Sequence, residues 1–254
     1  MRMLFVLALA WTWALVGCAL PVAFRNSEIP PQIADAARSS TIVMTWDGVE
    51  GGRCAALAAV VGESSIRTAF HVLQLHPGSG IYLDSYRHAY IDEVSTEWRV
   101  EQRGEYVRFK AGSRSDDWAT LSVSPSPRRT PVYYDPDLPL RVGDKVYIAG
   151  YDGVRFSSSG VINVSTELVF RTGRVISPVP SERPLDSQPE RLVFIEVEPP
   201  GLSRGWSGAP VFAADSTGGV RMVGTVIGGG VRGERRQGKQ SNHGEQDDFA
   251  IFVR

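Results

Sequence analysis

Short apolar runs separated by turn-forming residues follow one another from about residue 40 to the end of the chain. The runs are rich in β-branched and aromatic side chains, which is typical of strands. Pairs such as Asp47-Gly48 and Asp152-Gly153 separate them and favour tight turns. The predicted strands are Thr41–Trp46, Ala55–Val61, Ile66–Leu73, Ile81–Tyr86, Trp98–Gln102, Tyr106–Lys110, Trp118–Val123, Lys145–Tyr151, Leu168–Ser177, Leu192–Val197, Pro210–Ala213, Val220–Ile227 and Phe249–Val253. This pattern predicts an all-β barrel or sandwich.

Two groups of strands are indicated by an interruption near the middle of the chain. Ser124-Pro125-Ser126-Pro127 and, further on, Asp135-Pro136-Asp137 break the series of apolar runs. We therefore expect two all-β domains, at residues 40–133 and 134–254. A cleft between two packed domains is a favoured place for a binding site.

The N-terminal segment has a different pattern, because the 22 residues between Arg2 and Arg25 carry no charge. A positive start, an apolar stretch and then small residues are typical of an export signal. The same stretch is long enough to cross a bilayer if it is not cleaved. A cleaved signal peptide and an uncleaved anchor helix are both compatible with this pattern.

A lipid anchor is the third interpretation of this segment. Leu15-Val16-Gly17-Cys18 resembles the lipobox of bacterial lipoproteins, in which cleavage leaves an acylated cysteine as the first residue. The resemblance implies a signal peptide at residues 1–17, lipidation at Cys18 and a tether at residues 18–39. It also implies attachment to the cell envelope. In a cell with two membranes, Ala19 after the cysteine resembles the signal for sorting to the outer membrane, facing the periplasm.

Composition and charge exclude several classes of protein and of binding partner. The chain has 254 residues, of which 43% are hydrophobic and 22% charged, and this excludes a disordered tail, a coiled coil and a multi-pass membrane protein. A formal net charge of −1 supplies no general field for binding nucleic acid. We expect a monomer, with a polypeptide substrate and the membrane as its partners. If Cys18 is lipidated, Cys54 has no disulfide partner and is expected to behave as a core residue.

Three short segments contain the residue types of nucleophilic catalysis. His71 follows the apolar run Ile66-Arg67-Thr68-Ala69-Phe70, and Asp117 stands directly before the strand that begins at Trp118. Ser207 lies in the glycine-flanked turn Gly205-Trp206-Ser207-Gly208. A serine hydroxyl needs a neighbouring imidazole to accept its proton, and a carboxylate is needed to hold the imidazole in the correct tautomer.

Together these segments resemble the motifs of chymotrypsin-fold (trypsin-like) serine proteases, in particular the disulfide-poor bacterial members. Thr-Ala-Phe-His71 is similar to the family's Thr-Ala-Ala-His, and Asp117-Trp-Ala-Thr-Leu to Asp-Ile-Ala-Leu-Leu. Gly-Trp-Ser207-Gly-Ala-Pro is similar to Gly-Asp-Ser-Gly-Gly-Pro. The order of the three residues and their separations of 46 and 90 positions also suit the family.

The resemblance implies two six-stranded antiparallel β-barrels with the active site in the cleft between them. It implies that Ser207 is the nucleophile, His71 the general base and then acid, and Asp117 the orienting carboxylate. The backbone N–H groups of Gly205 and Ser207 would form the oxyanion hole. The substrate pocket would be lined by Gly201, Arg204, Val226, Ile227, Gly228 and Gly229. No cofactor and no metal ion are expected.

The residues also admit other interpretations. Asp116 is a second candidate for the carboxylate. Ala209 breaks the Gly-x-Ser-x-Gly pattern of α/β-hydrolases and stands where the protease family carries a glycine, and Phe70 replaces a small residue beside the histidine. An inactive relative that binds proteins is therefore the second hypothesis. Trp206 occupies the position at which digestive members carry an aspartate that pairs with a newly cut N-terminus, so we expect a domain that is competent without propeptide cleavage.

Overall fold

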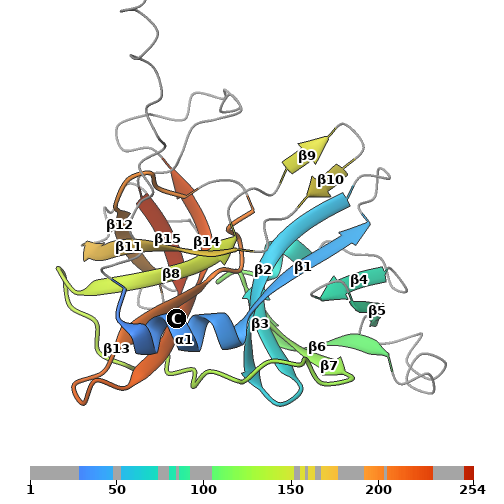
Figure 1. Cartoon of the computed structure of the whole chain (residues 1–254), viewed down its shortest axis with the longest axis horizontal. Helices are drawn as coiled ribbons and strands as arrows, with labels where there is room; N and C mark the ends of the chain where they lie inside the picture. Colours follow the sequence, from blue (N-terminus) through green and yellow to red (C-terminus); the bar gives the residue numbers. More distant parts are fainter. Residues whose placement is uncertain are drawn as a thin grey trace, which may run out of the picture.

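In a computed structural model, most of the described strands belong to two β-barrels that lie side by side (Figure 1). The structure describes residues 29–47, 53–73, 80–83, 86–91, 105–151, 155–157, 160–163, 167–176, 192–202, 205–230 and 249–254. The predicted signal peptide, Cys18 and the predicted strand at 98–102 lie outside these ranges. The two-barrel fold expected from the sequence motifs is confirmed.

The N-terminal barrel contains seven strands among the described residues, in the order β1-β2-β3-β7-β6-β5-β4, and β1 closes it by pairing with β4. Six antiparallel strands were expected. The run expected at 81–86 is divided between two strands, β4 and β5, which pair antiparallel. A further difference is that β5 runs parallel to β6. The strands are β1 Thr41–Asp47, β2 Arg53–Gly62, β3 Ser65–Ala69, β4 Gly80–Leu83, β5 Tyr86–Ile91, β6 Tyr106–Ser113 and β7 Trp118–Ser124.

The C-terminal barrel contains the expected six strands in its described part, in the closed order β11-β12-β15-β14-β13-β8. All of its strand pairs are antiparallel. The strands are β8 Lys145–Tyr151, β11 Leu168–Ile176, β12 Leu192–Val197, β13 Pro210–Ala214, β14 Val220–Gly230 and β15 Phe249–Val253. A separate hairpin of β9 (Arg155–Ser157) and β10 (Gly160–Asn163) lies beside the barrels (Figure 1).

Strand β7 shows why the apolar pattern predicted barrels. Its residues alternate between half-buried and buried positions, and Ala119, Leu121 and Val123 are the buried ones. Successive side chains of a strand point to opposite faces, so this alternation places one face inside the N-terminal barrel. In β8, by contrast, six of the seven residues are buried. Val146 and Ile148 belong to the C-terminal core, whereas Tyr147 and Ala149 pack in a second cluster on the other face of the sheet.

That second cluster is covered by helix α1 (Pro31–Ser40), which the sequence analysis assigned to the tether. The helix begins with Pro31, and a proline is well tolerated in the first turn. Ile33, Ala34 and Ala37 form its buried face. They pack with Ala59 of β2, in the N-terminal barrel, and with Phe212 of β13, in the C-terminal barrel. Residues 31–40 are therefore part of the folded domain, and the expectation of a tether as far as residue 39 is wrong for this segment.

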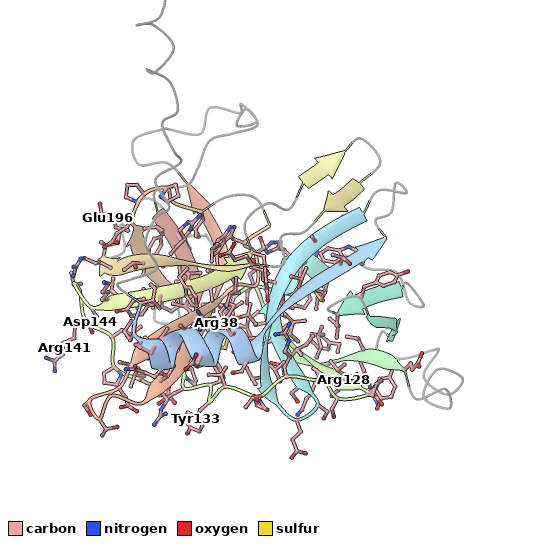
Figure 2. All side chains as sticks on the ribbon, in the orientation of Figure 1. Arg38, Arg128, Tyr133, Arg141, Asp144 and Glu196 are labelled. Atoms are coloured by element: carbon pink, nitrogen blue, oxygen red, sulfur yellow. The ribbon has the colours of Figure 1, made fainter. Side chains whose placement is uncertain are left out.

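Substituting Ile33 by alanine is expected to lower the free energy of unfolding by about 2–4 kcal/mol. Ile33 is fully buried in a cluster to which both barrels contribute, so the loss of its side chain leaves a cavity between them. The matched control is Arg38→Ala, because Arg38 lies on the exposed face of the same helix (Figure 2) and its side chain is 60% exposed. Denaturant unfolding measures both variants, and an equal effect of the two would contradict the prediction.

No helix in the described part of the chain is long and apolar enough to cross a membrane.

Candidate active site

His71 lies immediately after β3, in the single 3₁₀ turn η2 (Phe70–Leu73). The sequence pattern predicted that the strand would continue to Leu73, but the β3–β7 ladder ends at the pair Ala69 and Trp118. Within the turn, Val72 and Leu73 are buried in the core of the N-terminal barrel. The side chain of His71 points the other way and is 41% exposed. The turn thus holds the backbone firmly and leaves the imidazole accessible.

Asp117 directly precedes Trp118, which begins β7 and forms the last pair of the β3–β7 ladder. Its φ of 57° turns the backbone just before β7 begins. A non-glycine residue is uncommon at positive φ, and aspartate is one of the residue types that tolerate it best. The carbonyl oxygen of Asp117 accepts a hydrogen bond from the Phe70 amide at 3.1 Å. The backbone of the turn at Asp117 is therefore bonded directly to the turn that contains His71.

The carboxylate of Asp117 contacts His71 twice. Oδ1 accepts a hydrogen bond from the backbone N–H of His71 at 2.7 Å, and Oδ2 lies 2.7 Å from the imidazole Nδ1. This pair of contacts fixes both the position and the ring orientation of the histidine. With Nδ1 donating its proton to the carboxylate, Nε2 is left with the lone pair that a general base requires. The Asp117 side chain is 24% exposed, less than the imidazole.

Asp116, the alternative carboxylate, faces a different partner. It is 5% exposed, and its Oδ2 accepts a hydrogen bond from the Ser113 hydroxyl at 2.8 Å. The same hydroxyl accepts a hydrogen bond from the Asp116 amide at 3.1 Å. These contacts belong to the turn that leads into β7. Among the described residues, Asp117 is the carboxylate that contacts the imidazole.

Ser207 is at the centre of a tight turn that precedes β13. Gly205 and Gly208, on either side of it, have φ values of 93° and 85°, which favour glycine. The turn is closed by hydrogen bonds from Ala209 to the Trp206 carbonyl at 3.0 Å and from Gly208 to the Val226 carbonyl at 2.8 Å. Trp206 is 2% exposed and belongs to the C-terminal core. The serine side chain is half-buried.

The Ser207 turn is bonded to the opposite barrel. The amide of Leu57 on β2 donates a hydrogen bond to the Ser207 carbonyl at 2.8 Å. The carbonyl of Leu57 accepts one from the Thr68 hydroxyl at 2.7 Å. A Cβ atom on Gly208 would overlap both that carbonyl oxygen and that hydroxyl. Since Thr68 precedes His71 by only three residues, this contact brings the serine turn close to the strand that positions the histidine.

Of the three predicted catalytic residues, two are in direct contact and the third is linked to them through neighbouring residues. His71 and Asp117 are in direct contact, and the serine turn is bonded to β2 beside them. No hydrogen bond joins the Ser207 hydroxyl to the His71 imidazole among the described residues. Hydrogen bonds between a nucleophile and its base are often long in the absence of substrate. The catalytic role of the three side chains stays a prediction.

The residues predicted to line a substrate pocket differ in their burial and in the space around them. Gly228 has open space around it, because a Cβ there would meet no atom within 4 Å. Val226, by contrast, is 2% exposed and buries its side chain in the C-terminal core, so only its backbone faces the serine turn. Ile227 packs against core residues of both barrels. Gly201 is buried in a turn with a φ of 80°, Gly229 is half-buried, and Arg204 lies outside the described residues.

The sequence analysis also made predictions about Cys54 and about metal ions. Cys54 is a free, half-buried residue that packs against the core of the N-terminal barrel. Within the described ranges, no three His, Cys, Asp or Glu side chains are grouped so that they could hold a metal ion.

The sequence motifs did not reveal how the serine turn is held by Leu57, Thr68 and Arg171, although Thr68 begins the motif that contains His71. Leu57 and Thr68 bond or contact the turn from the opposite barrel, as described above. Arg171, on β11, places its guanidinium 5.4 Å from the centre of the Trp206 ring and donates a hydrogen bond to the Gly201 carbonyl at 2.8 Å. The only sequence signal for Arg171 is a charged residue in the middle of a β-strand.

Comparisons with known proteins identify the family and support the fold. A family model described as a trypsin-like peptidase domain matches residues 57–224. No curated protein sequence matches the chain. Among solved structures, the active form of the Rv3671c protease from M. tuberculosis is similar at 14% identity and a TM-score of 0.54, over 88% of this chain and 78% of that one. The scabies mite inactivated protease paralogue S-I1 is similar at 14% identity and a TM-score of 0.56, over 87% of this chain and 92% of that one.

At these identities the solved structures establish the fold alone. The family match goes further, because its 168 residues include His71, Asp117 and Ser207 and cover most of both barrels. The chain therefore belongs to the family of trypsin-like peptidase domains.

Proposed function

We propose that the chain is a serine endopeptidase that hydrolyses peptide bonds through Ser207, His71 and Asp117. The observation that carries this proposal is the double contact between the Asp117 carboxylate and His71, with 2.7 Å both to the backbone amide and to Nδ1. A structural ion pair would not require one carboxylate to bond both the backbone amide and Nδ1 of a histidine whose ring is also exposed. A general base requires both, since its ring must be oriented and its second nitrogen must reach the substrate site.

The reaction follows from the roles of these groups. The Ser207 Oγ attacks the carbonyl carbon of the peptide bond while Nε2 of His71 accepts the hydroxyl proton. Asp117 stabilises the imidazolium that forms. The N–H groups of Gly205 and Ser207 donate hydrogen bonds to the oxygen of the tetrahedral intermediate. His71 then gives its proton to the leaving amine, and an acyl-enzyme remains. Water attacks this ester by the same steps, which regenerates the serine.

An extended polypeptide suits the geometry of β14. Gly228 and Gly229 pair with β15, and the open space at the Cβ position of Gly228 leaves room for a substrate side chain over the strand. Backbone hydrogen bonds to such a strand supply affinity without requiring a particular side chain. The absence of an acidic residue at Gly201 gives no support for a preference for lysine or arginine in the substrate.

The alternative function is that of a catalytically inactive trypsin-fold lipoprotein that binds other proteins. The features in its favour are two departures from the family's motifs: Phe70 beside the histidine and Ala209 two residues after the serine. Both functions require the same fold, so only a chemical test separates them.

A fluorophosphonate probe is expected to label the protein covalently at Ser207, because such probes react only with an activated serine. Substituting Ser207 by alanine should abolish labelling while the unfolding temperature stays unchanged. Ser203→Ala, in which another serine before the same turn is replaced, is the matched control and should be labelled normally. A folded wild-type protein that is never labelled would establish the inactive alternative.

We also propose that a lipid on Cys18 attaches the enzyme to the cell envelope, on the outer membrane facing the periplasm in a cell with two membranes. Its support is the lipobox-like Leu15-Val16-Gly17-Cys18. Cys18→Ser is expected to move the protein from the membrane fraction to the soluble fraction, and loss of acyl-chain labelling should accompany the move. Membrane retention of the variant would indicate an uncleaved anchor helix in place of a lipid.

A further inference from the structure

We infer that Arg171 is a positioning residue for the oxyanion hole, an inference that rests on the proposed function. It contacts Gly201, which precedes Gly205, and Trp206, which follows it, and it thereby holds the serine turn in the conformation that directs the Gly205 and Ser207 N–H groups towards the substrate. The contacts that carry this inference lie within the C-terminal barrel and do not involve His71 or Asp117.

The first contact is at Gly201, where the segment leading to the serine turn begins. The Arg171 Nε–H donates a hydrogen bond to the Gly201 carbonyl at 2.8 Å. The neighbouring residue of β11, Thr172, accepts a hydrogen bond from the Glu198 amide at 2.9 Å, and the Gly201 amide donates to the Glu198 carbonyl at 3.0 Å. Residues 198–201 are thus a turn bonded to β11, and Arg171 holds its far end.

The second contact is at Trp206, directly before the serine. The Arg171 guanidinium carbon lies 5.4 Å from the centre of the indole ring, within the range of a cation–π interaction. The ring is also confined by neighbouring strands: a Cβ on Gly150 of β8 would lie 2.8 Å from two of its atoms and 2.9 Å from Leu57 Cδ1. The glycine therefore leaves the space that the indole occupies. With Trp206 only 2% exposed, the ring cannot turn without displacing Arg171, Leu57 or β8.

The Arg171 side chain therefore contacts both Gly201 and Trp206, which lie on either side of Gly205 in the sequence. Arginine suits this role better than lysine, because its planar guanidinium stacks on an aromatic ring and donates a hydrogen bond in the plane of the group at the same time. The outer nitrogen Nη1 also donates to the Phe170 carbonyl at 3.1 Å, which fixes the guanidinium against its own strand. These contacts are all made within the folded domain.

The test compares Arg171→Met, Arg171→Lys and the control Arg174→Met. Arg174 is on the same strand, is exposed, and donates a hydrogen bond at 3.3 Å to the carbonyl of Gly143.

We expect Arg171→Met to lower the rate of fluorophosphonate labelling about 100-fold, which is the scale of a lost or misplaced oxyanion donor. With a peptide substrate the loss should appear in kcat, with KM within about twofold. Arg171→Lys retains a donor but loses the contact between the guanidinium and the indole ring, and about a tenfold loss is expected. Arg174→Met should match the wild type.

A second measurement does not depend on activity. Amide hydrogen exchange at Gly201 and Ala209, whose hydrogen bonds close the two ends of the segment, should become faster in Arg171→Met and stay unchanged in Arg174→Met. Labelling and exchange at wild-type rates in Arg171→Met would overturn the inference, and so would slower labelling without faster exchange. If the wild-type protein is never labelled, the proposed function fails. The exchange rates then still decide whether Arg171 holds the segment.

Discussion

Substituting Asp117 by asparagine is expected to lower kcat about 10⁴-fold, with little effect on KM or on stability. Asparagine tolerates the φ of 57° at this position and can still accept the hydrogen bond from the His71 amide through its side-chain oxygen. Its amide nitrogen would then face Nδ1 of His71, where the carboxylate Oδ2 now lies at 2.7 Å. A donor there forces the imidazole to carry its proton on Nε2, so the ring can no longer accept the proton of Ser207.

Steady-state kinetics and an unfolding curve measure the two parts of this prediction. Asp116→Asn is the matched control, since the neighbouring carboxylate bonds to Ser113 and does not contact the imidazole. We expect the control to keep kcat within a few-fold of the wild type. Near-normal turnover of Asp117→Asn would show that another group orients His71, and a loss confined to Asp116→Asn would show that the carboxylate is misassigned.

Substituting Gly208 by alanine is expected to have the largest effect on stability, about 3–5 kcal/mol of unfolding free energy. The residue has a φ of 85°, which costs any other residue backbone strain, and a Cβ would overlap the Leu57 carbonyl and the Thr68 hydroxyl. Backbone atoms of a central strand cannot move aside as the end of a flexible side chain can. The serine turn must therefore separate from the N-terminal barrel, and activity should be lost with stability.

Gly218→Ala separates the two contributions. Gly218 has a similar φ of 82°, but a Cβ there would meet nothing within 4 Å. Its cost should therefore be the backbone strain alone, about 1–2 kcal/mol. Denaturant unfolding of both variants gives the comparison. Equal effects at the two glycines would mean that the close approach of the serine turn to β2 contributes nothing to stability.

The strands were predictable because each buried face imposes a local alternation. The predicted bounds of β8, β12 and β15 agree with the structure, and β1, β2 and β7 differ by at most two residues at either end. Predictions failed where a tertiary contact decided the conformation. The strand expected to run to Leu73 ends at Ala69, because the Asp117 turn bonds to Phe70 and His71 instead of extending the ladder. The expected single strand at 81–86 is divided between β4 and β5, and no glycine or proline within that run signalled the break.

Helix α1 was missed for a different reason. Its ten residues contain only three buried apolar side chains, Ile33, Ala34 and Ala37, and two of these are alanines. Such a short segment is barely helical alone, and most of its stability must come from packing against the two barrels. The sequence of residues 31–40 alone does not indicate that this segment packs across both barrels.

The sequence by itself determined the residue types of the candidate site and their order, because a histidine, a carboxylate and a serine in turn-like contexts are local features. It also determined the all-β class, through the alternation of apolar positions. Only the tertiary structure decided which carboxylate contacts His71, because Asp116 and Asp117 are neighbours and their directions depend on a single backbone φ. It alone revealed the roles of Leu57, Thr68 and Arg171. These residues act across distances of 30 to 150 positions in sequence, and contacts of that kind follow from how the barrels pack rather than from any local pattern.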